Sequence, residues 1–341
     1  MNNQTENFNQ APVETYEVPK ILTRKTKRLI FYTLMVSIPV LQFIIFYVYV
    51  NIESILMAFK TTELVTNPDT GLKYLQETFT WTLGTDKIFS NFSRIFVELE
   101  KVNYYYVTNA LKNYVLSFFT SGILSILFSY YVYKKFMFSG LFKVMLYLPS
   151  IVSSVVLVNV YSELVNNIVP NWLNDLAGDP NKYKSFLETD PYWWVILYAL
   201  FMALGGHILM YTGTMSGINE SVVESAQLDG VNAIQEFWYI TLPLIYPTFV
   251  TFTVTGLATV LTSNPNLHTF FGMQTPFFNG TATLGFWIFA STKEGISSGS
   301  SEGMMLSLNE VSAIGLMITA IILPISLGLK KAMTKLGPSV D

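Results

Sequence analysis

Six stretches of this sequence are each apolar over roughly the 20 residues that a helix needs to cross a bilayer. Charged residues are missing from the central part of every stretch, and Lys112, Lys143 and Glu310 lie near the ends. Lipid offers the backbone no hydrogen-bond partners, so each stretch is expected to fold as a helix. The sequence thus predicts an all-α, polytopic membrane protein whose six transmembrane helices cover residues 29–52, 107–133, 141–161, 192–215, 242–262 and 307–329.

The low charge content agrees with this class and argues against others. Only 13% of the residues are charged and the mean hydropathy is +0.41, whereas about a quarter of an average soluble domain is charged. The net charge of −3 gives no basis for binding nucleic acid. Cysteine is absent, and His207 and His268 are the two histidines. We therefore expect no disulfide, no metal site and no catalytic residue.

Basic residues near the span ends predict the orientation. Lysines and arginines close to a span tend to stay on the cytoplasmic side. This places both termini in the cytoplasm, with residues 1–23 as a polar, disordered tail, 24–335 as the membrane domain and 336–341 as a second tail. Residues 53–106 and 166–191 become outer loops, and 216–243 becomes a cytoplasmic loop. The residues that carry this prediction are Lys20, Arg24, Lys25, Lys27, Arg28, Lys134, Lys135, Lys143, Lys330, Lys331 and Lys335.

Two further features concern the outer loops and the third span. Four aromatic residues of the first outer loop are expected to form a small cap over the outer helix ends: Trp81, Phe89, Phe92 and Phe96. Pro149 lies inside the third predicted span, where it removes a backbone hydrogen bond and is expected to kink the helix.

The cytoplasmic loop 216–243 reads as two short helices with a bend between them. Ser221 with Glu224 three residues later has the spacing of a capping box, which predicts a helix from Val222. Gly230 is expected at its end, in a left-handed or closely packed position. A second helix is predicted over 232–239, and Pro243 is expected in the first turn of the fifth span.

The spacing within this loop is specific. Glu224, Ser225 and Ala226 are followed after three residues by Gly230, and after nine more by Ile240-Thr241-Leu242-Pro243. This resembles the EAA loop of binding-protein-dependent ABC importer permeases, with Ser225 where the family usually has Ala. Asp229-Gly230 and Leu242-Pro243 with Pro247 resemble the sugar branch of the family. The resemblance implies that a coupling helix docks on a separate ATPase through Glu224, Ser225, Ala226, Asp229, Gly230, Ile240, Leu242 and Pro243.

The resemblance also implies an assembly. The chain is expected to form one half of a heterodimer with a second homologous permease, in the plasma membrane of a bacterium. Two ABC ATPase subunits would bind ATP and Mg, and an extracellular solute-binding protein would deliver a sugar, expected to be an oligosaccharide. The sequence contains no G-x-x-x-x-G-K-[ST] pattern, so we expect a transporter subunit without its own ATP site or enzymatic activity.

The end of the fifth span is the most polar part of the membrane region. The resemblance places it on the substrate path, with Thr259, Ser263, Asn264, His268, Phe270 and Phe271 as candidates. Hydroxyls, amides and flat aromatic faces suit a neutral sugar, whereas a charged substrate needs a buried countercharge. The alternative is an outer turn with an interfacial aromatic belt. His207 either faces a polar pathway or is a hydrogen-bonded packing residue. The usual Gly-Gly-Pro turn of the family is not matched over 274–283.

Two other functional classes stay open at this point. An ATP-independent secondary transporter or channel is expected to carry an intramembrane carboxylate, and the span centres have none. A polytopic membrane enzyme would need clustered acidic or histidine groups at a membrane face, for which the loop offers Glu220, Glu224, Asp229 and Glu236. Vanadate-sensitive uptake separates an ATP-driven importer from both.

Overall fold

The computed structural model describes residues 24–66, 73–273, 275–294 and 306–338. Its contacts divide the chain into two units, Met1–Ser54 and Ile55–Asp341. The first unit contains α1 (Arg24–Phe43), the π-helical η1 (Ile44–Tyr49) and the start of α2 (Val50–Ala58). Together these elements form an apolar helix that is long enough to cross a membrane, as predicted for the first span.

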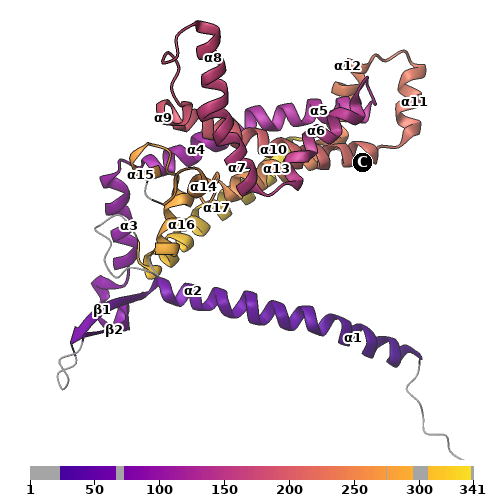
Figure 1. The fold of residues 1–341 in the computed structure, drawn as a ribbon. Coiled ribbons are helices and arrows are strands. Elements are labelled where there is room, and N and C mark those ends of the chain that lie inside the picture. The colour runs from indigo at the N-terminus through magenta and orange to yellow at the C-terminus, as the bar shows by residue number, and fades with distance from the viewer. Residues whose placement is uncertain (1–23, 67–72, 274, 295–305, 339–341) are drawn as a thin grey trace, which may run out of the picture. The chain divides into compact units, whose positions relative to one another are not determined.

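Among the described residues, the second unit contains four more helices long and apolar enough to span a membrane (Figure 1). They coincide with the second, fourth, fifth and sixth predicted spans, which confirms the all-α, polytopic fold. Their bounds are Tyr105–Tyr133 (α4 Tyr105–Ser117, η4 Phe118–Gly122 and α5 Ile123–Tyr133), Pro191–Ser216 (α10), Ala233–Thr259 (ending in α13, Leu242–Thr259) and Leu308–Leu336 (α17).

The third predicted span, 141–161, is broken, and the break lies beside Pro149, where the sequence predicts a kink. The chain forms α6 (Ser139–Ile151) and α7 (Ser154–Glu163), and the two helices are bent by 101° at the break. Pro149 lies in the last turn of α6 and removes one of its hydrogen bonds. Val152 and Ser153 then adopt extended backbone angles. The second half continues through η5 (Leu164–Ile168) into α8 (Val169–Ala177), and α9 (Phe186–Thr189) precedes α10.

The α4–α5 helix and α10 run parallel and in register. Three side-chain hydrogen bonds join them, and each links residues 79 positions apart in the chain. Serine is small enough to let the helices approach closely, and its hydroxyl finds a carbonyl where lipid would offer none. The three bonds are Tyr192 to Asn113 Oδ1 (3.1 Å), Ser121 to the Leu200 carbonyl (3.0 Å) and Ser129 to the Ile208 carbonyl (3.2 Å).

One end of the second unit gathers basic residues. The Tyr246 hydroxyl, in the first turns of α13, donates to the Met333 carbonyl near the end of α17 at 2.9 Å. The end of α5 lies beside the same loop as the start of α13 (Figure 1). The lysines that follow α5 and end α17 therefore lie at the same end of the bundle. They are Lys134, Lys135, Lys330, Lys331 and Lys335.

The opposite end carries a β-hairpin that the sequence analysis missed. Strands β1 (Lys60–Thr66) and β2 (Lys73–Phe79) pair antiparallel, followed by η2 (Thr80–Thr82), η3 (Thr85–Lys87) and α3 (Ser90–Lys101). The Asn91 amide donates to the Ala58 and Lys60 carbonyls at 2.8 Å and fixes the hairpin to α3. The predicted aromatic cap forms around Phe59, which contacts Trp81, Phe89 and Phe92. Phe96 was wrongly included, because it makes none of these ring contacts.

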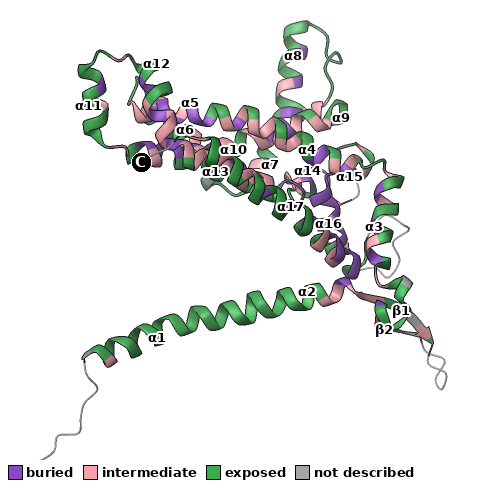
Figure 2. Cartoon of the chain, turned by 180° about the vertical axis from the view of Figure 1, so that it is seen from behind, coloured by how far each residue is buried: buried purple, intermediate pink, exposed green. Residues whose placement is uncertain are grey.

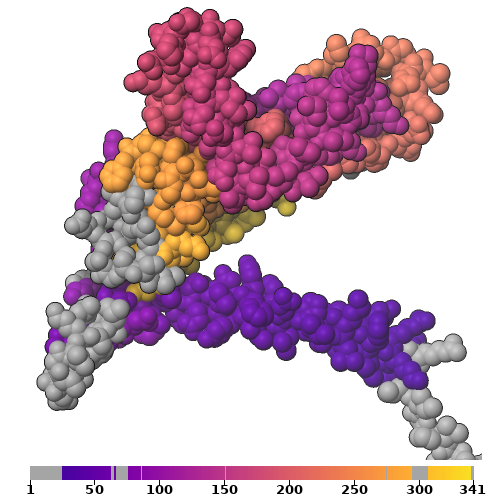
Figure 3. All heavy atoms as spheres, in the orientation of Figure 1, coloured from indigo at the N-terminus to yellow at the C-terminus, as the bar shows by residue number. Residues whose placement is uncertain are grey.

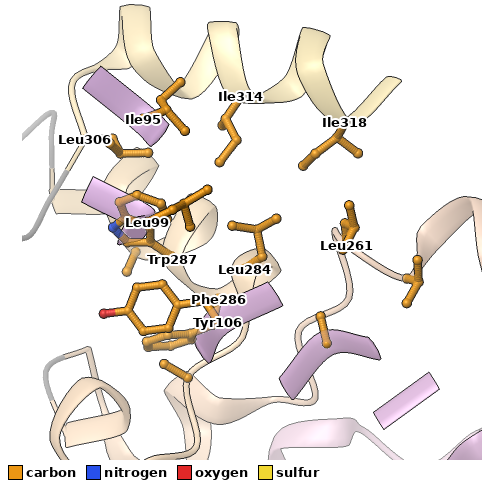
Figure 4. Close-up of a cluster of buried hydrophobic side chains, with 14 of the residues drawn as sticks. Ile95, Leu99, Tyr106, Leu261, Leu284, Phe286, Trp287, Leu306, Ile314 and Ile318 are labelled. Atoms are coloured by element: carbon orange, nitrogen blue, oxygen red, sulfur yellow. The ribbon is translucent and has the colours of Figure 1, made fainter. Parts of the chain in front are cut away.

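The largest apolar core surrounds α16 (Leu284–Glu294), a short helix outside the predicted spans. Figure 4 shows Phe286 and Trp287 of α16 among side chains of α3, α4 and α17. Figure 2 shows that α16 is largely buried, whereas the outer faces of the spanning helices are exposed. The helices α14 (Leu267–Phe271) and α15 (Thr275–Phe278) connect α13 to α16. The Gly- and Ser-rich stretch 295–303, whose composition predicts another outer loop, lies outside the described residues.

Gly285 is required where α16 approaches the end of the fifth span. A Cβ at this position would lie 2.5 Å from the carbonyl oxygens of Thr262 and Ser263, which are backbone atoms and cannot rotate away. Gly285→Ala should therefore destabilise the chain by about 1–3 kcal/mol, the range of overpacking, as measured by denaturation in detergent. Gly315→Ala in α17, where a Cβ meets open space, is the matched control. Equal stability of the two variants would contradict this packing.

Candidate functional site

The EAA loop, residues 216–243, begins with α11 (Glu220–Leu228). The Asn219 side chain accepts a hydrogen bond from the Ser221 N–H at 3.1 Å and caps the helix. The predicted cap at Ser221 was therefore wrong, and the helix begins two residues earlier. Asn219 has an extended backbone and a side-chain oxygen in reach of the first turn, which favours it as the cap. The Ser225 hydroxyl donates to the Ser221 carbonyl at 2.8 Å.

Gly230 ends α11 in a Schellman motif. Its φ is +79°, its N–H donates to the Gln227 carbonyl at 3.1 Å, and the Val231 N–H donates to the Ala226 carbonyl at 3.0 Å. This confirms the predicted left-handed position. A Cβ on Gly230 would meet no atom within 4 Å, so the requirement for glycine here comes from the backbone angle alone.

The second half of the loop is fused to the fifth span. Helix α12 (Ala233–Glu236) starts with a capping box in which Asn232 and Gln235 bond to each other's backbone at 2.9 and 3.0 Å. The chain then continues through the π-helical η6 (Phe237–Thr241) into α13. The predicted helix over 232–239 starts where expected but does not end at residue 239. Helices α12 and α13 therefore belong to one continuous helical segment, Ala233–Thr259.

The eight predicted coupling residues fall into two groups. Glu224, Ser225, Asp229 and Gly230 are exposed on α11 and its turn, whereas Ala226 is buried beneath them. Ile240, Leu242 and Pro243 are half-buried at the base of the loop. Three exposed apolar residues lie around the first group and were not among the predicted coupling residues, although apolar residues in a polar loop are a recognisable signal. They are Val222 (44% exposed), Ile234 (71%) and Leu228 (89%). Figure 3 shows α11 at the surface of the second unit, in salmon.

A buried ion pair holds the loop to the end of α5. Lys134 Nζ lies 2.8 and 2.7 Å from the two carboxylate oxygens of Glu236, and the two side chains are 16% and 3% exposed. One turn earlier, the Tyr130 hydroxyl donates to the Ala233 carbonyl at 2.7 Å. The Tyr130 ring also contacts Phe237, with centroids 5.0 Å apart. The loop is thus fixed both to α13, by the chain, and to α5, by side chains.

A cavity with a mixed, mainly apolar lining lies between α4, α10 and α13. It consists of two adjoining chambers of about 370 and 300 Å³ that share lining residues from all three helices. The shared residues are Tyr114, Ser117, His207, Gly256 and Thr259, and the first chamber adds Asn113, Ser263 and Asn266. Among the residues that the structure describes, no Asp, Glu, Lys or Arg lines either chamber, and no three His, Asp or Glu side chains come together as metal ligands.

The structure separates the six predicted substrate-path residues. Thr259 and Ser263 line the cavity. Phe270 and Phe271 instead line another cavity of about 350 Å³, beside α9 and α15. Asn264 accepts a hydrogen bond from the Leu267 N–H at 3.3 Å, and His268 contacts the Phe289 ring. These four residues follow the end of α13, in a segment whose Ser263 and Asn266 line the cavity while these four do not.

His207 is the cavity residue that the sequence left undecided. Its ring contacts Phe252 at 4.6 Å between centroids. Its Nδ1 atom is buried and has no hydrogen-bond partner among the described residues. Nδ1 therefore lacks the hydrogen bond that was expected if His207 were only a packing residue. Asn113, Tyr114 and Ser117 were also missed, because they come from the second span and meet the fifth only in the folded chain.

Comparison with known proteins agrees with this architecture. This chain is 26% identical to the lactose transport system permease protein LacF of Rhizobium radiobacter. The aligned region covers 46% of this chain and 54% of LacF. The chain thus spans about half the length of LacF. The arabinooligosaccharides transport system permease protein AraP of Halalkalibacterium halodurans is 25% identical over 72% of this chain and 74% of AraP.

A solved structure shares the fold. It belongs to a bacterial ABC transporter involved in the import of the acidic polysaccharide alginate, with a TM-score of 0.67, 19% identity, and coverage of 92% of this chain and 98% of the other. In addition, residues 119–341, which include the EAA loop and the cavity helices α10 and α13, match the family described as binding-protein-dependent transport system inner membrane component. The chain therefore belongs to the family of binding-protein-dependent transport system inner membrane components.

Proposed function

We propose that this chain is one of the two membrane-spanning halves of an ATP-driven importer, and that its EAA loop docks on a separate ATPase subunit. The observation that carries the proposal is the surface of α11 and α12. It presents Val222, Leu228 and Ile234 to the outside of the chain, flanked by the exposed carboxylates of Glu224 and Asp229. Exposed apolar side chains on a rigid loop favour an apolar groove on a partner, with basic residues at its rim.

The remaining partners follow from the same assignment. ATP and Mg would be bound by the ATPase, a second homologous permease would complete the cavity, and an extracellular binding protein would deliver the substrate. The loop must then face the cytoplasm, where ATP is, and both termini with it. The lysines gathered at the loop end support this orientation. In the related alginate transporter, the solved complex includes a periplasmic protein with bound alginate pentasaccharide.

The cavity favours a neutral sugar as substrate, and the relatives favour an oligosaccharide. Amide, hydroxyl and imidazole groups line it together with the Tyr114 ring, and none of the described lining residues carries a fixed charge. Sugar hydroxyls need directional hydrogen bonds, and sugar C–H faces pack on aromatic rings. An acidic sugar would leave its carboxylate without a countercharge inside the membrane, which is costly.

In the proposed mechanism, α11 and the spanning helices move as rigid bodies. ATP binding draws the two ATPase subunits together, and α11 moves with the groove that holds it. The spanning helices then rock and open the cavity to the outer side. Nucleotide needs to favour that state by only a few kcal/mol to shift the population.

The assembled complex in liposomes tests the proposal. Arabino-oligosaccharides and lactose serve as neutral probes and alginate oligosaccharides as the acidic probe. We expect the tagged chain to co-purify with an ATPase and a second permease, and uptake of a neutral probe to stop with vanadate. Uptake that continues with vanadate would favour a secondary transporter or channel instead. Preferred uptake of the acidic probe would contradict the neutral-sugar assignment.

His207→Ala tests the substrate path. We expect uptake of the neutral probe to fall about tenfold, because one hydrogen bond to the sugar is lost. Membrane insertion should not change, since no described residue bonds to Nδ1. His268→Ala is the matched control, because His268 is the other histidine and lies outside the cavity. Equal uptake by the two variants would remove His207 from the path.

A further inference from the structure

We propose that the Lys134–Glu236 ion pair is a positioning element that passes movement of the EAA loop to the α4–α5 helix, one wall of the cavity. This inference rests on the proposed function and concerns residues outside the coupling motif. Glu236 lies six residues beyond Gly230, on α12, and Lys134 directly follows α5.

Chain connectivity explains why such a link is needed. The loop continues directly from α10 and into α13, so both helices follow it through the covalent chain. The α4–α5 helix is separated from the loop by α6, α7, α8, α9 and α10. Yet it supplies Tyr114, Ser117, Phe118 and Gly122 to the cavity wall. At the loop end, this helix is held to the loop by side-chain contacts.

The geometry of the pair suits the transfer of force. The Lys134 ammonium bonds to both oxygens of Glu236, which fixes the direction of the carboxylate as well as its distance. Glu236 is the last residue of α12, whose start is held by the capping box at Asn232. The carboxylate is thus attached to a helix whose start is fixed, and Lys134 holds its direction. Because both side chains are largely buried, solvent screens the attraction little, and loss of one partner leaves a buried charge unpaired.

Farther from the loop, the same helix is tied to α13 inside the cavity. The Tyr114 hydroxyl donates to the Thr253 carbonyl at 3.0 Å, and the Tyr114 ring covers Gly256. With the ion pair at the loop end, α4–α5 and α13 are thus linked at two levels. A displacement of the loop is expected to move both walls together.

The absence of cysteine from this chain gives a direct test. Ser117→Cys places a single thiol in the cavity wall of the α4–α5 helix. The complex is assembled with cysteine-free partner subunits, and a water-soluble maleimide is added with and without ATP plus vanadate. We expect trapping to change the labelling rate about tenfold in the parent chain, and Glu236→Gln or Lys134→Met to remove most of that change. Lys135→Met is the matched control, because Lys135 has no ion-pair partner among the described residues.

Two measurements distinguish a positioning role of the ion pair from a role in the folding of the loop. Glu236→Gln should still co-purify with the ATPase, because the Gly230 turn and the Asn232 capping box are intact. The exchanged pair, Lys134→Glu with Glu236→Lys, should restore the labelling change. A full response in Glu236→Gln, loss of the ATPase from that variant, or an exchanged pair that binds ATPase without responding would each overturn the proposal. No response in the parent chain itself would instead count against the proposed function.

Discussion

Gly230→Val is expected to abolish uptake while the chain still inserts into the membrane. The left-handed backbone angle of +79° at Gly230 lets α11 end and the loop turn back toward α12. For an L-residue this conformation costs roughly 1–2 kcal/mol, and a β-branched side chain is among the least suited to it. The loop should therefore refold locally, and α11 should lose its fixed direction. The measurement is vanadate-sensitive uptake alongside the amount of chain in the membrane.

Two controls make this prediction specific. Gly178 ends α8 in the same Schellman geometry, with φ +68° and the Asp179 N–H bonded to the Asn174 carbonyl. Gly178→Val thus imposes the same local strain away from the EAA loop and should leave most uptake intact. Gly230→Asn should also retain uptake, because asparagine tolerates the left-handed region. Equal loss in Gly178→Val and Gly230→Val would mean that strain anywhere in the chain inactivates the transporter.

Leu228→Asp is expected to weaken ATPase binding about 30-fold or more, the effect of removing an interface residue worth 2 kcal/mol. Leu228 is 89% exposed, so within this chain the substitution breaks little. Stability of the isolated chain should change by less than about 0.5 kcal/mol, as for other surface positions. The loss arises because the aspartate would carry a charge into an apolar groove on the partner. Titration of the purified ATPase against the chain in nanodiscs measures the affinity.

The control for Leu228→Asp is Leu176→Asp. Leu176 lies on α8, away from the EAA loop, and is also an exposed leucine. The control variant should bind the ATPase as tightly as the parent chain does. If Leu228→Asp also binds with parental affinity, the exposed face of α11 is not the docking surface, and the proposed coupling through this loop is wrong.

Local patterns predicted the elements that depend on neighbouring residues. Among the described residues, the apolar runs locate five continuous spanning helices and the bent pair α6–α7, because a lipid-length run without charges has few alternatives. Gly230 ends α11 as expected, because a helix end needs few distant contacts. The N-cap of α11 was misplaced because Asn219 and Ser221 can both cap a helix, and backbone geometry decides between them.

Long-range contacts decided the rest. The β-hairpin and the buried α16 depend on partners more than 100 residues away, such as Thr62, whose hydroxyl accepts a hydrogen bond from Asn309 in α17. The predicted path residues after α13 were separated because they contact different elements. Ser263 lines the cavity between α4, α10 and α13, whereas Phe270 and Phe271 line the one beside α9 and α15. No periodicity in the sequence indicates which element each of them contacts.

The sequence by itself determined that this chain spans a membrane and carries an EAA loop with the spacing of its family. Both are encoded by length, polarity and spacing along the chain, so they can be read without knowing which helices meet. Only the tertiary structure brought Lys134 to Glu236, and His207 to Thr259 across a cavity. Those pairs lie far apart in the sequence, and they meet because helix packing fixes which faces of α5, α10 and α13 turn inward.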